Sequence, residues 1–191
     1  VVDMTRNEER RRALADAGVR ILAREGARGL THRAVDRDAA VPVGTASNYF
    51  RTRAELIRAL VLRIGERLQP SADDLRLRAE QPAGPALFAD YMRDLVRRLT
   101  QDRDVAMALF ELRLESARRP EVAGLIAEWR SESFEQDVAF NEAAGLPGGS
   151  RHIALFHYAI EGLVLDRLTT PLMPATSTDD IIDDLVAGLL P

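Results

Sequence analysis

The sequence predicts an all-α protein, and three observations support this fold class. Apolar residues recur at spacings of three, four and seven, as they do on the buried face of a helix. No stretch alternates apolar and polar residues with the period of two that is typical of a half-buried strand. Glycine and proline divide this pattern into segments of helical length, so we expect about nine helices and no sheet.

The composition limits the classes of protein to which the chain can belong. Its 191 residues include no cysteine, which excludes disulfides and thiolate metal sites. No signal peptide and no run of roughly 18 apolar residues is recognisable, so we expect a cytoplasmic protein without a membrane segment. Residues 1–53 hold 11 Arg against 7 acidic residues, whereas residues 54–191 hold 15 Arg against 23. This asymmetry favours binding of a polyanion at one end, although chance variation on solvated helix faces explains it equally well.

The N-terminal residues contain clear helix stops. We expect a loose arm over residues 1–7 and a first helix from residue 7 or 8 to Glu25. Gly26 then provides a left-handed stop. Thr31 is a suitable cap for a short second helix, because its hydroxyl can accept from an unpaired backbone N–H.

The next segment favours two more helices. Pro42 cannot continue the second helix and suits the first position of a new one, which is expected over Val43 to Phe50. Thr52 to Glu55 fits the capping-box pattern, so another helix is expected from about Arg53 to Leu68. Two short helices joined by a tight turn are the geometry of a DNA-reading helix-turn-helix.

The rest of the chain is helical in pattern after one interruption. Residues 69–85 contain three prolines and one glycine and form the one plausible internal boundary, with a helical turn near residues 73–78. Longer helices are expected over 86–100, 102–118, 121–144, 150–168 and 179–190, the last of them capped by Ser177 or Thr178.

A series of short motifs also occurs in order within residues 7–68: Glu25-Gly26, Gly29-Leu30-Thr31, Ala39-Ala40-Val41, Gly44-Thr45, Tyr49-Phe50, Arg53 and Leu56. In this order and spacing the motifs resemble the N-terminal domain of the tetracycline-repressor (TetR) family of bacterial transcription regulators. The resemblance implies an all-α homodimer with a helix-turn-helix domain at residues 7–52 and a connecting helix at 53–68. It further implies a C-terminal effector-binding and dimerisation domain at residues 84–190.

Four positions depart from the common pattern of that family. Ala40 replaces a glycine of the turn, Pro42 replaces a serine, Ser47 replaces an aromatic residue and Asp36 replaces a small residue. None of these changes breaks the helix-turn-helix interpretation. The phosphate contact that the aromatic residue commonly makes would pass from position 47 to Tyr49 or Asn48.

The resemblance also implies which residues meet DNA. The second helix of the helix-turn-helix would enter the major groove, where each base pair shows a distinct pattern of donors and acceptors. The residues expected nearest base edges are Val43, Thr45, Ser47 and Asn48; those expected on phosphates are Tyr49 and Arg53; those expected on the DNA backbone or one base are Thr31 and Arg33. Asn48 is the best candidate reader, because its amide both donates and accepts.

The segment Ser150–Leu168 is apolar on two sides and therefore needs two packing partners. One partner is the core of its own chain, and the other is expected to be the same helix of a second subunit. The expected dimer interface, completed by the last helix, consists of Ile153, Phe156, Ile160, Gly162, Leu163, Ile181, Leu185 and Leu189. A central helix in a monomer is the alternative.

An effector pocket is expected among the aromatic and methionine side chains of the C-terminal half. The candidates are Phe88, Tyr91, Met92, Met107, Phe110, Glu111, Trp129, Phe134, His157, Tyr158 and Glu161. This mixture, with few polar groups, suits a medium-sized organic ligand. The same residue types at helical spacing are also typical of an ordinary core.

Two other functions are alternatives to a regulator. His157 and Glu161 are four residues apart and could bind a metal or form an acid–base pair. However, the chain has three histidines, no nucleophile motif and no phosphate-binding glycine loop, so we expect no enzyme, metal or cofactor. The other alternative is a DNA-binding adaptor whose C-terminal domain binds a protein. The favoured interpretation is a homodimeric, ligand-responsive repressor on a near-palindromic double-stranded operator.

Overall fold

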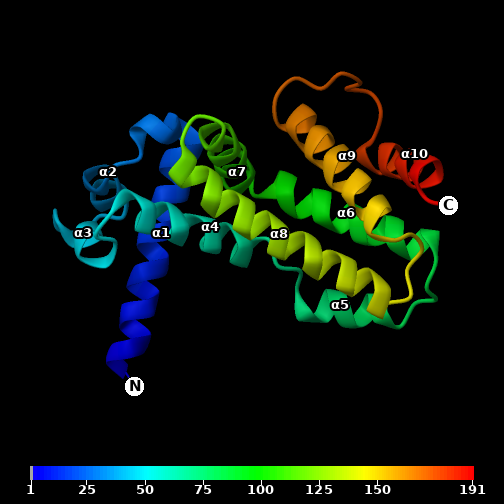
Figure 1. The fold of residues 1–191 in the computed structure, drawn as a ribbon, viewed down its shortest axis with the longest axis horizontal. Helices are drawn as coiled ribbons and strands as arrows, with labels where there is room; N and C mark the ends of the chain where they lie inside the picture. The colour runs from blue at the N-terminus through cyan, green and yellow to red at the C-terminus, as the bar shows by residue number, and fades with distance from the viewer. Residues whose placement is uncertain (1) are drawn as a thin grey trace. The chain divides into compact units, whose positions relative to one another are not determined.

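The computed structural model describes residues 2–191, with side chains from residue 6 onward, and this part of the chain folds into ten helices without a strand (Figure 1). The all-α class is therefore confirmed, with one helix more than expected because residues 72–79 form a full helix rather than a turn. The helices are α1 (Val2–Gly29), α2 (His32–Asp38), α3 (Thr45–Tyr49), α4 (Arg53–Arg67), α5 (Ala72–Ala79), α6 (Pro85–Gln101), α7 (Arg103–Ser116), α8 (Pro120–Ala143), α9 (Ser150–Leu168) and α10 (Thr178–Leu189).

The chain divides into two compact units. The first comprises the residues up to Arg67 together with Asp102–Trp129, and the second comprises Leu68–Gln101 together with Arg130–Pro191. Helix α7 and the start of α8 thus pack with the N-terminal helices, whereas the sequence placed all of residues 84–190 in one domain. The sequence pattern shows that α7 is a helix but not that its partner is α1, which it contacts extensively. The functional domain boundaries stay a prediction.

Helix α1 is longer than expected. It begins at Val2, so the arm expected over residues 1–7 is already helical in its described part, and only Val1 lies outside the described residues. No glycine or proline occurs in these residues to interrupt the helix. At its other end Gly26 adopts φ 68°, a left-handed conformation that breaks the helix at the expected position.

The core of the first unit lies where α1 meets α2, α4 and α7. Its fully buried side chains include Leu14, Ile21, Leu22, Leu30, Phe50, Leu56, Leu60, Ile64 and Leu112. Gly18 allows α1 and α4 to approach closely, because a Cβ there would lie 2.8 Å from Cδ1 of Leu60. This packing fixes the helices on which the α2–α3 pair rests (Figure 1).

In the second unit α6, α9 and α10 pack against one another (Figure 1). Phe88 of α6 and Phe156 of α9 are buried with their ring centroids 4.7 Å apart. Ile182 and Val186 of α10 are also buried. The cap of α10 is Ser177, one of the two expected residues, and its hydroxyl accepts from the backbone N–H of Asp180 at 3.0 Å.

The described helices differ in length and in apolar character. None of them combines the length and the apolar character needed to cross a lipid bilayer.

Candidate DNA-binding site

Helix α2 begins at the residue that the sequence predicts. Oγ1 of Thr31 accepts a hydrogen bond from the backbone N–H of Ala34 at 3.1 Å, which is the expected cap. The helix ends in a turn in which Ala40 has φ 51°. This left-handed conformation explains why the family favours glycine there, since any Cβ adds strain. The turn from α2 to α3 therefore contains a strained residue.

Helix α3 is shorter than the expected segment Val43–Phe50. Pro42 does not begin the helix, because the first helical residue is Thr45 and the N-cap is Gly44 with φ 95°. Instead, the carbonyl of Pro42 accepts from the backbone N–H of Thr45 at 3.1 Å and from its Oγ1 at 2.6 Å. Pro42 therefore belongs to the turn, and the left-handed Gly44 explains why glycine is needed at this point.

The residues expected at base edges differ in whether their side chains already form hydrogen bonds within the protein. Val43 is 80% exposed, and Ser47 and Asn48 are exposed as well. Thr45 and Ser47 donate their hydroxyl hydrogens to the carbonyls of Pro42 and Gly44, respectively. Among the described residues Asn48 has no side-chain partner of this kind, so its amide is available to DNA.

Arg53, expected on a phosphate, has a role within the fold. Its guanidinium donates to the backbone carbonyls of Ala27 (2.6 Å) and Leu30 (2.5 Å), so it fastens the link between α1 and α2. Arg33 is exposed on α2, where its charge can reach a phosphate. Contact of either arginine with DNA stays a prediction.

The N-terminal half of α1 adds residues that the sequence interpretation missed. Arg6, Asn7 and Arg10 line a hollow of about 470 Å³ together with Tyr49 of α3. Arg11 donates to the carbonyl of Tyr49 at 3.4 Å. The signal was the four-residue spacing of Arg6 and Arg10, which places them on one helix face, but these residues were assigned to an arm and its junction. The hollow brings positive charge beside a residue expected on phosphate.

Helix α2 is tied to α1 by an ion pair at its C-terminal end. The carboxylate of Asp38 accepts from Nε of Arg20 at 2.8 Å and from Arg24. Burial raises the pKa of Asp38, but the hydrogen bonds and positive charges of the two arginines outweigh burial and hold the pKa below its ordinary value. The charged carboxylate therefore stabilises the attachment of α2.

The start of α4 contains a variant of the expected capping box. The backbone N–H of Glu55 donates to Oγ1 of Thr52 at 3.1 Å, as expected. The Glu55 carboxylate accepts from the backbone N–H of Arg51 at 2.7 Å rather than from that of Thr52. At the other end of α4, Arg67 donates to Asp16 of α1 and to Asp102, which caps α7.

The residues expected in an effector pocket are divided between the two units. Met107, Phe110, Glu111 and Trp129 belong to the first unit, and the other candidates belong to the second. Glu111 accepts from the backbone N–H of Ala27 at 3.0 Å and so supports the break in α1. Phe88 is a core residue with 1% exposure. Contact of either residue with an effector stays a prediction.

Within the second unit several of the other candidates have partners. The ring of Tyr91 lies 5.1 Å from that of Phe140, and Phe134 lies 5.7 Å from His157. His157 is also 3.0 Å from the carboxylate of Asp137. Glu161 is paired with Arg130, Met92 is half-buried and Tyr158 is 65% exposed. The arrangement is compatible with packing and does not by itself define a ligand site.

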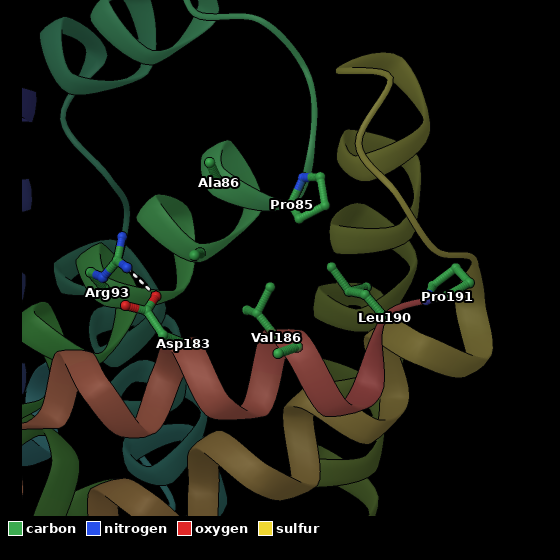
Figure 2. A pocket seen from close by; sticks show the side chains of 9 residues that line it. Pro85, Ala86, Arg93, Asp183, Val186, Leu190 and Pro191 are labelled. Carbon is green, nitrogen blue, oxygen red and sulfur yellow. Dashed lines mark hydrogen bonds and ion pairs between the residues drawn. The ribbon is translucent and has the colours of Figure 1, made fainter.

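A groove of about 430 Å³ lies between α6 and α10 (Figure 2). Figure 2 shows the Arg93–Asp183 ion pair at one end and Leu190 with Pro191 at the other. None of the expected effector residues lines this groove.

The residues of the expected dimer interface differ in burial within the single chain. Ile153, Phe156, Ile160 and Leu163 are buried within the single chain, and their contact with a second copy stays a prediction. The opposite face of α9 is open, with exposed residues at the helical spacing of Tyr158, Gly162 and Leu165. The expected residues Ile181, Leu185 and Leu189 of α10 are half-buried.

The helix pair α2–α3, its short turn and the exposed face of α3 define a helix-turn-helix of the DNA-binding type. Comparison with known sequences then identifies the family of the chain. A family model described as "Tetracyclin repressor-like, C-terminal domain" matches residues 83–191, which is more than half of the chain. The chain belongs to the tetracycline-repressor-like family of transcription regulators.

Solved structures agree with this family. The multidrug-binding protein EbrR in complex with ethidium is 26% identical, with a TM-score of 0.67, over 95% of this chain and 99% of that chain. A TetR-family member from Streptomyces coelicolor A3 is 25% identical, with a TM-score of 0.68, over 96% and 99%. A transcriptional regulator from Rhodococcus sp. Rha1 shares the fold at 21% identity, with a TM-score of 0.69, over 94% and 95%. Among curated proteins, no relative matches the sequence.

Proposed function

We propose that the chain is a homodimeric, ligand-responsive repressor that reads a near-palindromic DNA operator with α3. The observation that carries this proposal is the exposed Ser47–Asn48 surface of α3, whose next residue, Tyr49, lines a hollow with Arg6 and Arg10 of α1. The polar side chains suit base edges and the arginines suit phosphates. A dimer would place two such helices in successive major grooves about one turn apart.

Selection of DNA from a random library with the purified protein tests this proposal directly. We expect enrichment of a two-half-site sequence. Asn48→Ala should then weaken binding to the selected duplex by about 1–3 kcal/mol and leave binding to scrambled DNA almost unchanged. Ser47→Ala is the matched control, because the Ser47 hydroxyl already donates to the carbonyl of Gly44 and should contribute less. Equal losses on both duplexes would contradict base reading by Asn48.

The proposed dimer uses the open face of α9 around Tyr158, Gly162 and Leu165, together with α10. Gly162 lies on this face, and a Cβ there would meet nothing within the same chain, so a second chain has room to approach. We expect Gly162→Arg to convert the protein to a monomer in sedimentation. Leu163→Ala, on the buried face, should lower stability without changing the mass of the assembly. A wild-type monomer at micromolar concentration without DNA would refute the dimer.

The proposed effector is a medium-sized organic molecule bound by the helices of the C-terminal half. EbrR has been crystallised with ethidium and with malachite green, so these two compounds are suitable first probes. The acidic candidates Glu111 and Glu161 have protein partners, which favours an effector recognised mainly by apolar contacts. The two α3 helices of a dimer would stand at one spacing when DNA is bound and at another when it is released. The effector must bind these two conformations unequally, because otherwise it would not change DNA binding.

A thermal-shift screen separates this proposal from that of an adaptor that binds a protein partner. A ligand that binds only the native state raises the melting temperature by mass action. We expect at least one aromatic probe to do so and to release the selected DNA. A protein whose melting temperature responds to no small molecule, and which retains a protein from its own host on a DNA column, would support the adaptor instead.

A further inference from the structure

Asp36 of α2 is the most deeply buried acidic residue of the helix-turn-helix, with 1% exposure. It stands where the family commonly has a small residue. Its two carboxylate oxygens accept from the backbone N–H groups of Gly44 (2.7 Å) and Ala46 (2.6 Å). These two N–H groups belong to the N-terminal end of α3, so a side chain of one helix caps the next.

Helix α3 depends on help of this kind because it has only five residues. A helix that short is not stable in water by itself, since forming the first turn costs more than its few hydrogen bonds return. Its N-cap is Gly44, which has no side chain with which to cap the helix. The backbone N–H of Thr45 is taken by the carbonyl of Pro42, and those of Gly44 and Ala46 are taken by Asp36.

The buried carboxylate of Asp36 in turn depends on the N–H groups of α3. No arginine or histidine of the described residues forms an ion pair with this carboxylate, although a buried charge without partners is very unfavourable. The aligned N–H groups at the start of a helix carry a partial positive charge and stabilise an anion there. The carboxylate and the start of α3 therefore hold one another in a single geometry.

We propose that Asp36 is the positioning residue for DNA reading: by capping α3 from α2, it sets the angle at which Ser47 and Asn48 meet the bases. Asp36 does not touch DNA, because it is buried, and it acts through α3. This inference rests on the proposed function. It differs from a general stabilising role because it predicts a loss of discrimination between DNA sequences.

The test compares Asp36→Asn with Asp38→Asn in the full-length chain. Both variants replace a carboxylate on α2 by an amide, but Asp38 is bonded to Arg20 and Arg24 of α1 and not to α3. In Asp36→Asn an NH₂ group faces one of the two backbone N–H groups, which loses its acceptor. The DNA probes are the duplex selected by the wild-type protein and a scrambled duplex of equal length.

We expect Asp36→Asn to bind the selected duplex about tenfold more weakly, the size expected for loss of a helix cap, and to bind scrambled DNA within about twofold of wild type. Asp38→Asn should keep the wild-type ratio between the two duplexes. Amide hydrogen exchange of Gly44 and Ala46 should accelerate in Asp36→Asn and not in Asp38→Asn. An unchanged ratio of affinities, or the same change of ratio in both variants, would overturn the inference.

If Asp36→Asn does not fold, measurements on the wild-type chain still test the cap on which the inference depends. Through-hydrogen-bond NMR couplings between the amide nitrogens of Gly44 and Ala46 and the Asp36 carboxyl carbon should be detectable, and their absence would overturn the inference. These couplings require no DNA. If the wild-type protein selects no duplex, the proposed function fails, whereas the couplings and the exchange rates still judge the cap.

Discussion

The helix-turn-helix and the α6–α9–α10 group are stabilised by different kinds of contact. In the first, α2 and α3 have seven and five residues and are held by side chains that bond to backbone groups, namely Thr31, Asp36, Arg53 and Glu55. In the second, longer helices are held by buried apolar side chains such as Phe88 and Phe156. Polar contacts fix the orientation of the helices, whereas apolar contacts stabilise them by burying surface area. Mutations in the two regions should therefore have different effects.

The largest effect is expected in the apolar region. Phe88→Ala should lower the free energy of unfolding by about 3–5 kcal/mol, because it leaves a cavity against Phe156. Trp129 is the only tryptophan and belongs to the first unit. Denaturant unfolding followed by far-ultraviolet circular dichroism should therefore shift more than unfolding followed by Trp129 fluorescence. Coincident shifts would show that the two units unfold together and would weaken the contrast.

Arg53→Ala tests the polar region and should have the next largest effect. The carbonyls of Ala27 and Leu30 would lose a charged donor, so we expect a loss of about 1–3 kcal/mol in stability. Arg33→Ala is the matched control, because Arg33 is exposed on α2. Arg33→Ala should leave stability unchanged and reduce the slope of log affinity against log salt by about one phosphate contact. If Arg53→Ala reduced that slope instead, Arg53 would contact a phosphate in addition to fastening the link.

The sequence was sufficient to predict what depends on neighbouring residues. Thr31, Thr52 and Ser177 are caps as predicted, and Gly26 ends the regular part of α1, because these signals act within a few residues. The contact of Asp36 with Gly44 and Ala46 was not predicted. It depends on the direction in which one side chain crosses a turn, and no local pattern records that direction.

The same distinction applies to the second half of the chain. Helical periodicity shows that α9 has two apolar faces but not which face its own chain covers, and the structure buries Ile153 and Leu163 within the single chain. The sequence also does not show what Glu111 contacts. Its partner, the N–H of Ala27, lies 84 residues away along the chain. Tertiary neighbours of this kind cannot be predicted from one sequence by periodicity.

The pH dependence of stability offers a smaller test of the polar region. The pKa of Asp38 is lower in the folded chain than its ordinary value of 3.8, so its ion pair stabilises the fold above that pH. This contribution is small because the arginines are partly exposed, and it is lost as pH falls through the folded pKa. Thermal unfolding of Asp38→Asn should therefore show a shallower decline below pH 4 than the wild type. Parallel acid profiles would mean that other carboxylates dominate.

The smallest effect is expected at high pH in the second unit. Burial raises the pKa of Tyr91 above its ordinary value of 10.0, an increase that the charge of Arg78 opposes and that of Asp90 reinforces. Above pH 10 the unfolded chain ionises first, so stability should decline as pH rises from there to the folded pKa. Tyr91→Phe keeps the ring that packs on Phe140 and removes the ionisable hydroxyl. Melting temperatures of this variant and the wild type should agree near pH 8 and separate by a few degrees near pH 11, with the variant more stable. If the wild type were instead more stable than Tyr91→Phe at high pH, the Tyr91 hydroxyl would form a stabilising contact. The free energy of that contact would exceed the cost of keeping the hydroxyl neutral. The apolar region would then depend on a polar group in the same way as the helix-turn-helix.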